Sequence, residues 1–137
     1  MPFPRTTVAV VVSHEPLIAI VDDDESFRES VQALLQSAGH RAVTFGSAEQ
    51  FLASRAAATA DCLILDLRMP DIDGFELHRR MHTAGLRIPT IVITAHADDV
   101  SRARALAAGA AAFLRKPFQP DVLLQAIDTA MRESWPS

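Results

Sequence analysis

The sequence has little of several features that mark particular classes of protein. Its single cysteine, Cys62, rules out an internal disulfide, and its place in an apolar stretch suits a small buried residue. No hydrophobic run approaches the roughly 18 residues of a membrane span. The run Val8–Val12 is also too short for the core of a signal peptide. These absences indicate a cytoplasmic protein that does not enter the membrane.

Positive charge is scarce as well. Lysine and arginine together number 13 against 17 aspartates and glutamates, so the formal net charge is −4 and the chain lacks the overall basic character of a nucleic-acid-binding domain. Lys116 is the only lysine, although arginine fills every other basic position. Because an ammonium is a compact point charge and a guanidinium is planar, this usage suggests that position 116 requires an ammonium.

What the sequence does contain is a regular alternation of strands and helices. Its 137 residues, 49% of them hydrophobic, suffice for one folded domain. Apolar runs predict five strands, at Leu17–Val21, Arg41–Phe45, Cys62–Leu65, Thr90–Thr94 and Ala111–Leu114. Helical spacing follows each of them, from about Ser26, Ser47, Gly74, Asp98 or Asp99, and Pro120. Short connections between such elements predict an α/β fold: a doubly wound, five-stranded parallel sheet with helices on both faces.

The predicted elements use up the chain in one domain, over residues 17–132. Residues 1–16 hold three prolines and are expected to form a flexible N-terminal lead-in. Residues 133–137 are expected to form a C-terminal tail. No second domain, internal repeat or low-complexity tract remains outside these ranges.

Polar residues stand directly after four of the predicted strands. They are Asp22, Asp23, Asp66, Thr94 and Lys116. The C-terminal ends of parallel strands meet at one edge of a sheet, and open α/β sheets bind their ligands at that edge. We therefore expect these five side chains to gather into one site, with Asp66 at the end of the central strand.

Three carboxylates at one edge repel one another unless a cation lies among them. The expected ligands are oxygens, with no nearby pair of histidines or cysteines, which favours a hard ion such as Mg²⁺, with Mn²⁺ as an alternative. A carboxylate can also act as a nucleophile and form an aspartyl phosphate. In that chemistry Lys116 would pair with the phosphoryl oxygens, and the Thr94 hydroxyl would donate a hydrogen bond to one of them.

Four motifs, in this order, resemble those of the receiver domain of two-component response regulators, and the FixJ-type regulators are the most similar. The motifs are Ile20-Val21-Asp22-Asp23, Asp66-Leu67-Arg68-Met69-Pro70-Asp71 with Asp73-Gly74, Ile93-Thr94-Ala95, and Lys116-Pro117-Phe118. The resemblance covers about residues 17–132. It implies a flavodoxin-like sheet with strand order 2-1-3-4-5.

The resemblance also implies roles for the site residues. Asp66 would accept a phosphoryl group from a sensor histidine kinase or a histidine phosphotransferase. Mg²⁺ would be held by Asp22, Asp23 and Asp66, with Asp23 a more direct ligand than Asp22, and by the backbone carbonyl of Arg68. The domain would then be a signalling phosphoacceptor that takes part in its own phosphorylation and dephosphorylation, and not an enzyme acting on other substrates.

The resemblance further implies a conformational switch. Thr94 and Lys116 would bind the phosphoryl group, and the Lys116–Pro117 peptide bond would be cis. Phe113 would turn inward when Thr94 moves toward the phosphoryl group, and its alternative role is that of an ordinary aromatic on the last strand. A homodimer on phosphorylation would use the helix that starts at Asp98 or Asp99, the last strand and the last helix.

Two other functions stay open at this point. A phosphorylation-independent interaction module would not need the complete set of acids, Thr94 and Lys116. An aspartate-nucleophile phosphohydrolase would share the metal and the aspartyl phosphate, but those enzymes carry a second acid two residues after the nucleophile, where this chain has Arg68. The sequence is compatible with a natural single-domain regulator and with the receiver part of a longer protein.

Overall fold

The computed structural model describes residues 15–69 and 72–134 of the chain. Most of the predicted lead-in, including Val8–Val12, and residues 135–137 of the predicted tail lie outside the described residues. Pro70 and Asp71, in the turn that follows Asp66, do so as well. The predicted lead-in and tail therefore remain predictions.

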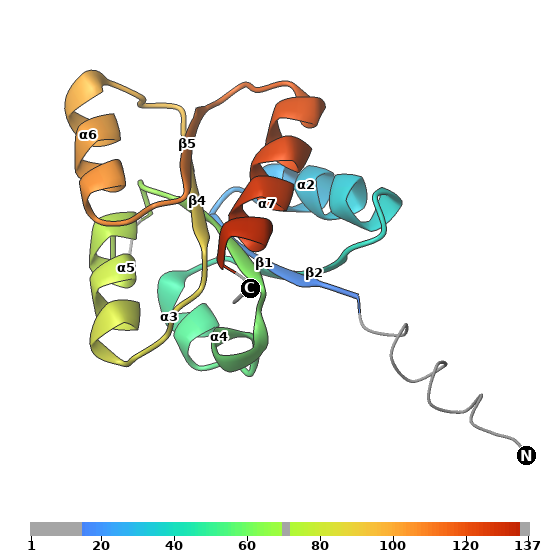
Figure 1. Cartoon of the computed structure of the whole chain (residues 1–137), viewed down its shortest axis with the longest axis horizontal. Coiled ribbons are helices and arrows are strands. Elements are labelled where there is room, and N and C mark those ends of the chain that lie inside the picture. Colours follow the sequence, from blue (N-terminus) through green and yellow to red (C-terminus); the bar gives the residue numbers. More distant parts are fainter. Residues whose placement is uncertain (1–14, 70–71, 135–137) are drawn as a thin grey trace, which may run out of the picture.

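Five parallel strands form the single sheet of the described residues (Figure 1). They are β1 (Leu17–Val21), β2 (Arg41–Phe45), β3 (Cys62–Asp66), β4 (Thr90–Thr94) and β5 (Ala112–Arg115). The strand order β2-β1-β3-β4-β5 confirms the predicted fold class. Two strands differ from the prediction by one residue, because backbone pairing sets their ends: Asp66 pairs with Ile93, and Arg115 pairs with Thr94.

Six helices cover this sheet in the described part of the chain. They are α2 (Glu25–Ser37), α3 (Ala48–Leu52), α4 (Ala56–Thr59), α5 (Gly74–Thr83), α6 (Asp99–Ala107) and α7 (Pro120–Ser134). The helix expected from Ser47 is split into α3 and α4, because both the backbone N–H and the hydroxyl of Ser54 donate to the Phe51 carbonyl and close α3. At the other end of the chain, α7 includes two residues of the predicted tail.

The helices lie on both faces of the sheet, as predicted. Alternate residues of the central strands point to opposite faces, so that each strand contributes to two cores. Ile18, Ile20 and Ile64 pack with α2 and α7, whereas Ala19, Leu63 and Leu65 pack with α3, α4 and α5. Figure 1 shows α2 and α7 on one side of the sheet and α5 and α6 on the other. Burial on both faces explains why β1, β3 and β4 read as continuous apolar runs.

Helices α2, α5 and α6 begin just beyond the edge of the sheet at which β1, β3 and β4 end. Each is capped by an aspartate that precedes it: Asp24 accepts from Phe27 N–H at 3.3 Å, Asp73 from Glu76 N–H at 2.8 Å and Asp98 from Ser101 N–H at 2.7 Å. A side-chain acceptor at this position satisfies one of the free N–H groups of the first helical turn. The caps therefore fix the residue at which each of these helices begins beside the C-terminal edge.

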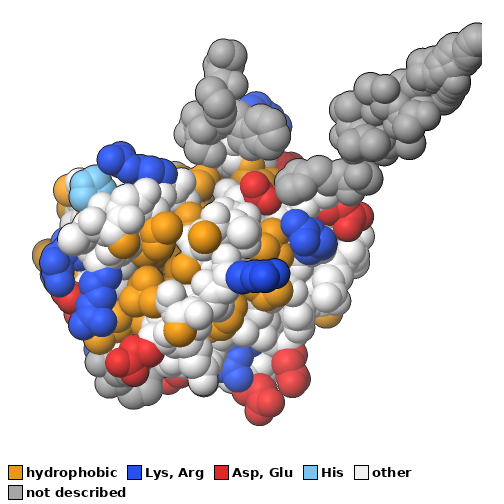
Figure 2. Space-filling view, turned by 90° about the horizontal axis from the view of Figure 1, so that it is seen from below, with side chains coloured by type: hydrophobic (Ala, Val, Ile, Leu, Met, Phe, Trp, Pro, Cys, Tyr) orange, Lys and Arg blue, Asp and Glu red, His pale blue; other side chains and the backbone are white. Residues whose placement is uncertain are grey.

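The end of the molecule opposite the C-terminal edge of the sheet carries both positive and negative side chains. Figure 2 shows it from below, with acidic and basic side chains interspersed among hydrophobic ones. Over residues 15–69 and 72–134, every helix is too short or not apolar enough to cross a bilayer.

Cys62 offers a chemical probe of global unfolding. The side chain is fully buried in β3, and this burial raises the pKa of its thiol to about 12. Since the thiolate is the reactive form, we expect iodoacetamide at pH 8 to modify the folded protein at least about a hundredfold more slowly than the urea-unfolded protein. Mass spectrometry over time measures this, and equal rates in the two states would contradict the burial of Cys62.

Gly74 brings the start of α5 against the end of β3. Its N–H donates to the Leu67 carbonyl at 2.9 Å. A Cβ added to Gly74 would lie 3.0 Å from the Asp66 carbonyl oxygen and 3.0 Å from the Leu67 Cα. Both neighbours are backbone atoms next to the proposed phosphoacceptor, and such atoms move only if the strand end or the helix shifts.

We therefore expect Gly74→Ala to lower the free energy of unfolding by about 1–3 kcal/mol, the usual penalty for overpacking a filled site. The sign of this change tests the close contact, because a Gly→Ala change at an unstrained helical position raises the free energy of unfolding by about 0.4–1 kcal/mol. Urea unfolding followed by circular dichroism measures the difference. A stabilised variant would show that the contact with β3 is looser than it is in this structure.

Candidate functional site

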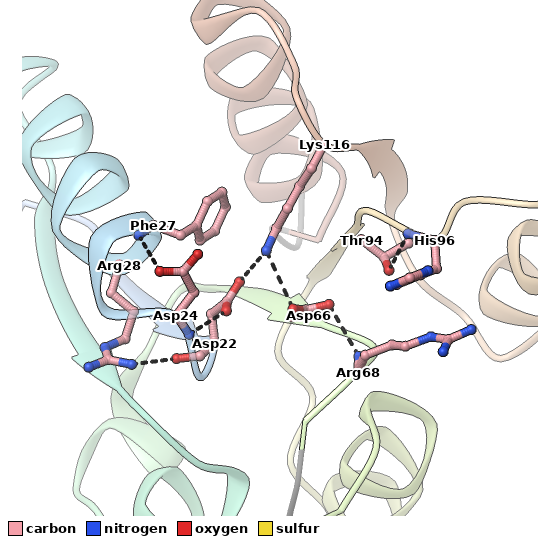
Figure 3. A network of polar contacts seen from close by, with 9 residues as sticks. All are labelled: Asp22, Asp24, Phe27, Arg28, Asp66, Arg68, Thr94, His96 and Lys116. Atoms are coloured by element: carbon pink, nitrogen blue, oxygen red, sulfur yellow. Dashed lines mark hydrogen bonds and ion pairs between the residues drawn. The ribbon is translucent and has the colours of Figure 1, made fainter.

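Four of the predicted site residues lie together at the C-terminal edge of the sheet: Asp22, Asp23, Asp66 and Lys116. Asp22 follows β1, Asp66 ends β3, and Lys116 follows β5 (Figure 3). Asp22 and Asp66 are 1% and 8% exposed, so both carboxylates lie at the bottom of the site. The backbone N–H of Asp22 donates to the Phe45 carbonyl at 3.1 Å, which holds this residue in line with the β1–β2 pairing.

The Lys116 ammonium lies between the two buried carboxylates. Its Nζ is 2.7 Å from Asp22 Oδ2 and 3.4 Å from Asp66 Oδ2, and it also lies 4.0 Å from the centre of the Phe27 ring. Burial lowers the pKa of Lys116, but the hydrogen bond to Asp22 and the charges of Asp22 and Asp66 outweigh that effect and raise the pKa above its usual value. Lys116 is therefore a fixed positive charge at neutral pH.

Asp22 is the most enclosed acid of the site. Burial raises its pKa, and the nearby charge of Asp66 raises it further, against the hydrogen bonds from Lys116 and from the Asp24 N–H. Both of its carboxylate oxygens are used, since Oδ1 accepts from Asp24 N–H at 2.9 Å and Oδ2 accepts from Lys116. Asp22 therefore has less freedom than an exposed aspartate to turn toward a new ligand.

Asp22, Asp23 and Asp66 together have the composition of a divalent-cation site. One carboxylate oxygen from each lies within 4.8 Å of the other two, and Asp23 is exposed where the other two are buried. The donor set is entirely oxygen, which fits a hard cation such as Mg²⁺ better than a metal that prefers nitrogen or sulfur ligands. One ammonium does not balance three carboxylates, so a bound cation would relieve the remaining repulsion.

Thr94 and Arg68 line the open side of the site. Thr94 is buried at the end of β4; its hydroxyl accepts from His96 N–H at 3.1 Å, and its carbonyl accepts from Lys116 N–H at 2.9 Å. The backbone N–H of Arg68 donates to Asp66 Oδ1 at 3.2 Å. Together with Asp23, these two residues border a hollow of about 610 Å³ that opens to solvent.

The last two sequence predictions concern β5 and the loop that follows it. The Lys116–Pro117 peptide bond is cis. Phe113 is not part of the site: it is half-buried on β5 and packs beside Leu67, Val92 and Ala105. The switching role of Phe113 therefore stays a prediction.

Three further residues make contacts in or beside the site that the sequence did not predict. The ring of Phe27, on α2, lies beside the Lys116 ammonium. Arg28 Nη1 donates to the Asp22 carbonyl at 2.7 Å. Arg104 stacks on Phe75, with 3.8 Å between the guanidinium carbon and the ring centre. Each contact joins two different elements, or a helix and a loop. The spacing of the paired residues in the sequence does not predict these contacts.

The chain is similar to known proteins in sequence and in structure. The model of the response regulator receiver domain matches residues 18–128. The response regulator protein TmoT of Ectopseudomonas mendocina is 41% identical over 118 residues, which are 86% of this chain and 54% of that protein. The transcriptional regulatory protein FixJ of Bradyrhizobium diazoefficiens is 37% identical over 120 residues, or 88% of this chain and 58% of that protein. The chain thus spans little more than half the length of these relatives.

The structures agree with the sequences. The crystal structure of FixJ-N has a TM-score of 0.80 at 38% identity and covers 90% of this chain and 98% of its own. The low-resolution structure of the response regulator StyR has a TM-score of 0.80 at 42% identity, over 88% of this chain and 61% of that one. Since a family model covers most of the chain, and both sequence and structure match FixJ, the chain belongs to the response-regulator receiver domains of two-component signalling and is similar to the FixJ type.

Proposed function

We propose that Asp66 accepts a phosphoryl group from the phosphohistidine of a sensor kinase or a histidine phosphotransferase, in a magnesium-dependent reaction. The observation that carries this proposal is the contact between Asp66 and Lys116 inside a cluster of three carboxylates. A carboxylate needs a cation beside it to accept a phosphoryl group, because the attacking and the transferred oxygens are both negative. The site places a fixed ammonium at that position.

Each residue of the site would have its own role in the transfer. An Asp66 oxygen forms the new P–O bond while the P–N bond of the donor breaks, and the departing imidazole nitrogen keeps the electron pair. Lys116 would pair with the phosphoryl oxygens, and the Thr94 hydroxyl would donate to one of them. Backbone donation from Arg68 orients the Asp66 carboxylate before the attack.

Asp22, Asp23, Asp66 and the carbonyl of Arg68 would hold the ion. When bound, Mg²⁺ supplies positive charge to the phosphoryl oxygens, and Mn²⁺ has similar ligand preferences. Asp23 is the more direct ligand in this proposal, because its carboxylate is exposed whereas both oxygens of Asp22 already accept hydrogen bonds.

Phosphorylation would act as a switch through Thr94. Its hydroxyl now accepts the His96 N–H, so a turn toward the phosphoryl group would give up that bond and release the loop before α6. Phe113 packs on Ala105 of α6 and would follow this movement. The affected face comprises α6, β5 and α7, which would also carry a homodimer. In this proposal the chain acts in the cytoplasm and catalyses only its own phosphorylation and dephosphorylation.

The alternative functions are less well supported by the site. A phosphohydrolase would need a second acid close to the nucleophile, and the exposed side chain two residues after Asp66 is that of Arg68. An interaction module without phosphorylation would have no use for a buried pair of carboxylates around one ammonium. The matched residues are only 58% of the length of FixJ. In this proposal the output of the chain is carried either by a further domain or by the face of α6, β5 and α7.

The first test of this proposal is phosphorylation by acetyl phosphate in the presence of Mg²⁺. We expect intact mass to increase by one phosphoryl group in the parent protein and in Asp128→Asn, which makes the same chemical change at an exposed position on α7. Asp66→Asn is expected to show no increase, because an amide lacks the nucleophilic oxygen. Omission of Mg²⁺ or addition of EDTA is expected to abolish labelling of the parent.

The outcomes separate the proposals from one another. No labelling of the parent, under conditions that label another receiver domain, would contradict the phosphoacceptor assignment and favour an interaction module. Labelling that persists in Asp66→Asn would place the acceptor at another residue.

A second test concerns the cation. Asp23→Asn is expected to weaken Mg²⁺ binding at least about tenfold, because the loss of one direct charge contact changes the binding free energy by about 1.4 kcal/mol or more. Asp24→Asn is the matched control, since Asp24 is the neighbouring exposed acid and asparagine can still cap α2. Mg²⁺ titration monitored by amide chemical shifts measures both variants. A loss of the same size in both would point to general acidity and would argue against direct ligation by Asp23.

A further inference from the structure

The hollow beside Asp66 is larger than a phosphoryl group requires. Its volume is about 610 Å³, and it extends from the proposed metal site toward α5 and α6. Polar and charged groups on its wall include Thr94, His96, Ser101, Arg68 and Arg104. Two arginines beside a phosphoacceptor are unexpected, because Lys116 already supplies the positive charge next to Asp66.

The side chain of Arg104 stacks on the ring of Phe75. Its guanidinium carbon lies 3.8 Å above the centre of the Phe75 ring, and Phe75 packs with Leu67 and Val92. Stacking occupies one face of the planar guanidinium and leaves its N–H groups at the edge free to donate. A stacked arginine of this kind gives up less side-chain entropy when it binds an anion than an unconstrained one.

Arg68 presents its charge on the same side of the site. Its backbone N–H is bound to Asp66, whereas its side chain points away from that carboxylate, on the side where His96 lies (Figure 3). The hydrogen bonds from Ser101 lower the pKa of Asp98, and the charge of Arg68 lowers it further.

Three acids lie near the two arginines, and two of them, Asp23 and Asp73, belong to the wall of the hollow. Asp98 accepts from Ser101 N–H at 2.7 Å, Asp73 accepts from Glu76 N–H at 2.8 Å, and Asp23 belongs to the proposed cation site. Among residues 15–69 and 72–134, the ion pairs with lysine or arginine involve Arg79, Arg80 and Lys116, and neither Arg68 nor Arg104. Both guanidiniums are exposed at the wall of the hollow.

We propose that this hollow is a subsite for an anionic group that the phosphodonor carries beside its phosphorylated imidazole, and that Arg104 together with Arg68 recognises it. The inference rests on the proposed function and adds a preference in donor chemistry to it. The phosphoryl group itself goes to Asp66 and Lys116, so the second anion belongs to the part of the donor that leaves. In a donor protein it would be the carboxylate of an acidic side chain beside the phosphohistidine, and a carboxylate attached to the imidazole represents it in a small donor.

The group-transfer step is the same with or without this second anion. The P–N bond breaks, a P–O bond to Asp66 forms, and the ring nitrogen keeps the electron pair and takes a proton from solvent. A carboxylate on the ring adds only a charge-assisted contact with a guanidinium. Because both arginines are exposed, that contact is screened, and a rate advantage of about threefold to fivefold is expected from it.

Two small donors with the same reactive group test this directly. N-phosphoimidazole lacks a second anion, and N-phosphoimidazole-4-propionate carries a carboxylate. The rate of Asp66 phosphorylation is measured by intact mass with each donor in the presence of Mg²⁺, and the ratio of the two rates is compared between variants. Arg104→Gln removes the proposed contact. Arg102→Gln is the matched control, because Arg102 is exposed on the same helix but lines a different hollow, with Asp99 and Phe113.

We expect the carboxylate-bearing donor to react about threefold to fivefold faster with the parent protein and with Arg102→Gln, and the ratio to fall toward one in Arg104→Gln. Equal rates for the two donors in the parent, or an unchanged ratio in Arg104→Gln, would overturn this inference while leaving the phosphoacceptor assignment intact. Absence of labelling by either donor would overturn both.

Discussion

Two buried carboxylates that share one ammonium set the conditions for the rest of this structure. Asp22 and Asp66 are brought together by strands that are neighbours in the sheet, and Lys116 meets both from a loop 94 residues after Asp22. One positive charge reduces the repulsion between them without cancelling it, and Asp23 adds a third carboxylate close by. The site is therefore stable enough to fold and remains electrostatically prepared for a divalent cation and a phosphoryl group.

The surrounding elements hold this arrangement from several directions. Phe27 and Arg28 on α2 contact Lys116 and the Asp22 carbonyl, so that the first helix supports both sides of the ion pair. Gly74 allows α5 to start against the backbone of Asp66. Thr94 accepts two backbone-linked hydrogen bonds at the end of β4. The supports therefore come from three different parts of the fold: α2, the start of α5 and the end of β4.

Much of this fold could be predicted because its signals are local. Strands buried on both faces leave continuous apolar runs such as Ile18–Val21 and Cys62–Leu65, and their boundaries were predicted to within one residue. The break between α3 and α4 could not be predicted, since alanine favours helix throughout and the end of α3 depends on hydrogen bonds from Ser54. The stacking of Arg104 on Phe75 could not be predicted either. It joins α6 to α5, and sequence periodicity gives no information on contacts between two helices.

The sequence by itself determined the strand–helix alternation, the polar residues at the ends of four of the five strands and the motifs that resemble receiver domains, because each depends on residues close together in the chain. The parallel sheet then follows from short connections, and with it the meeting of Asp22, Asp66 and Lys116 at one edge. Only the tertiary structure decided that Asp22 is enclosed while Asp23 is exposed, and that two arginines line the hollow beside them. Burial and side-chain direction depend on atoms contributed by several elements at once, and no single stretch of sequence contains that information.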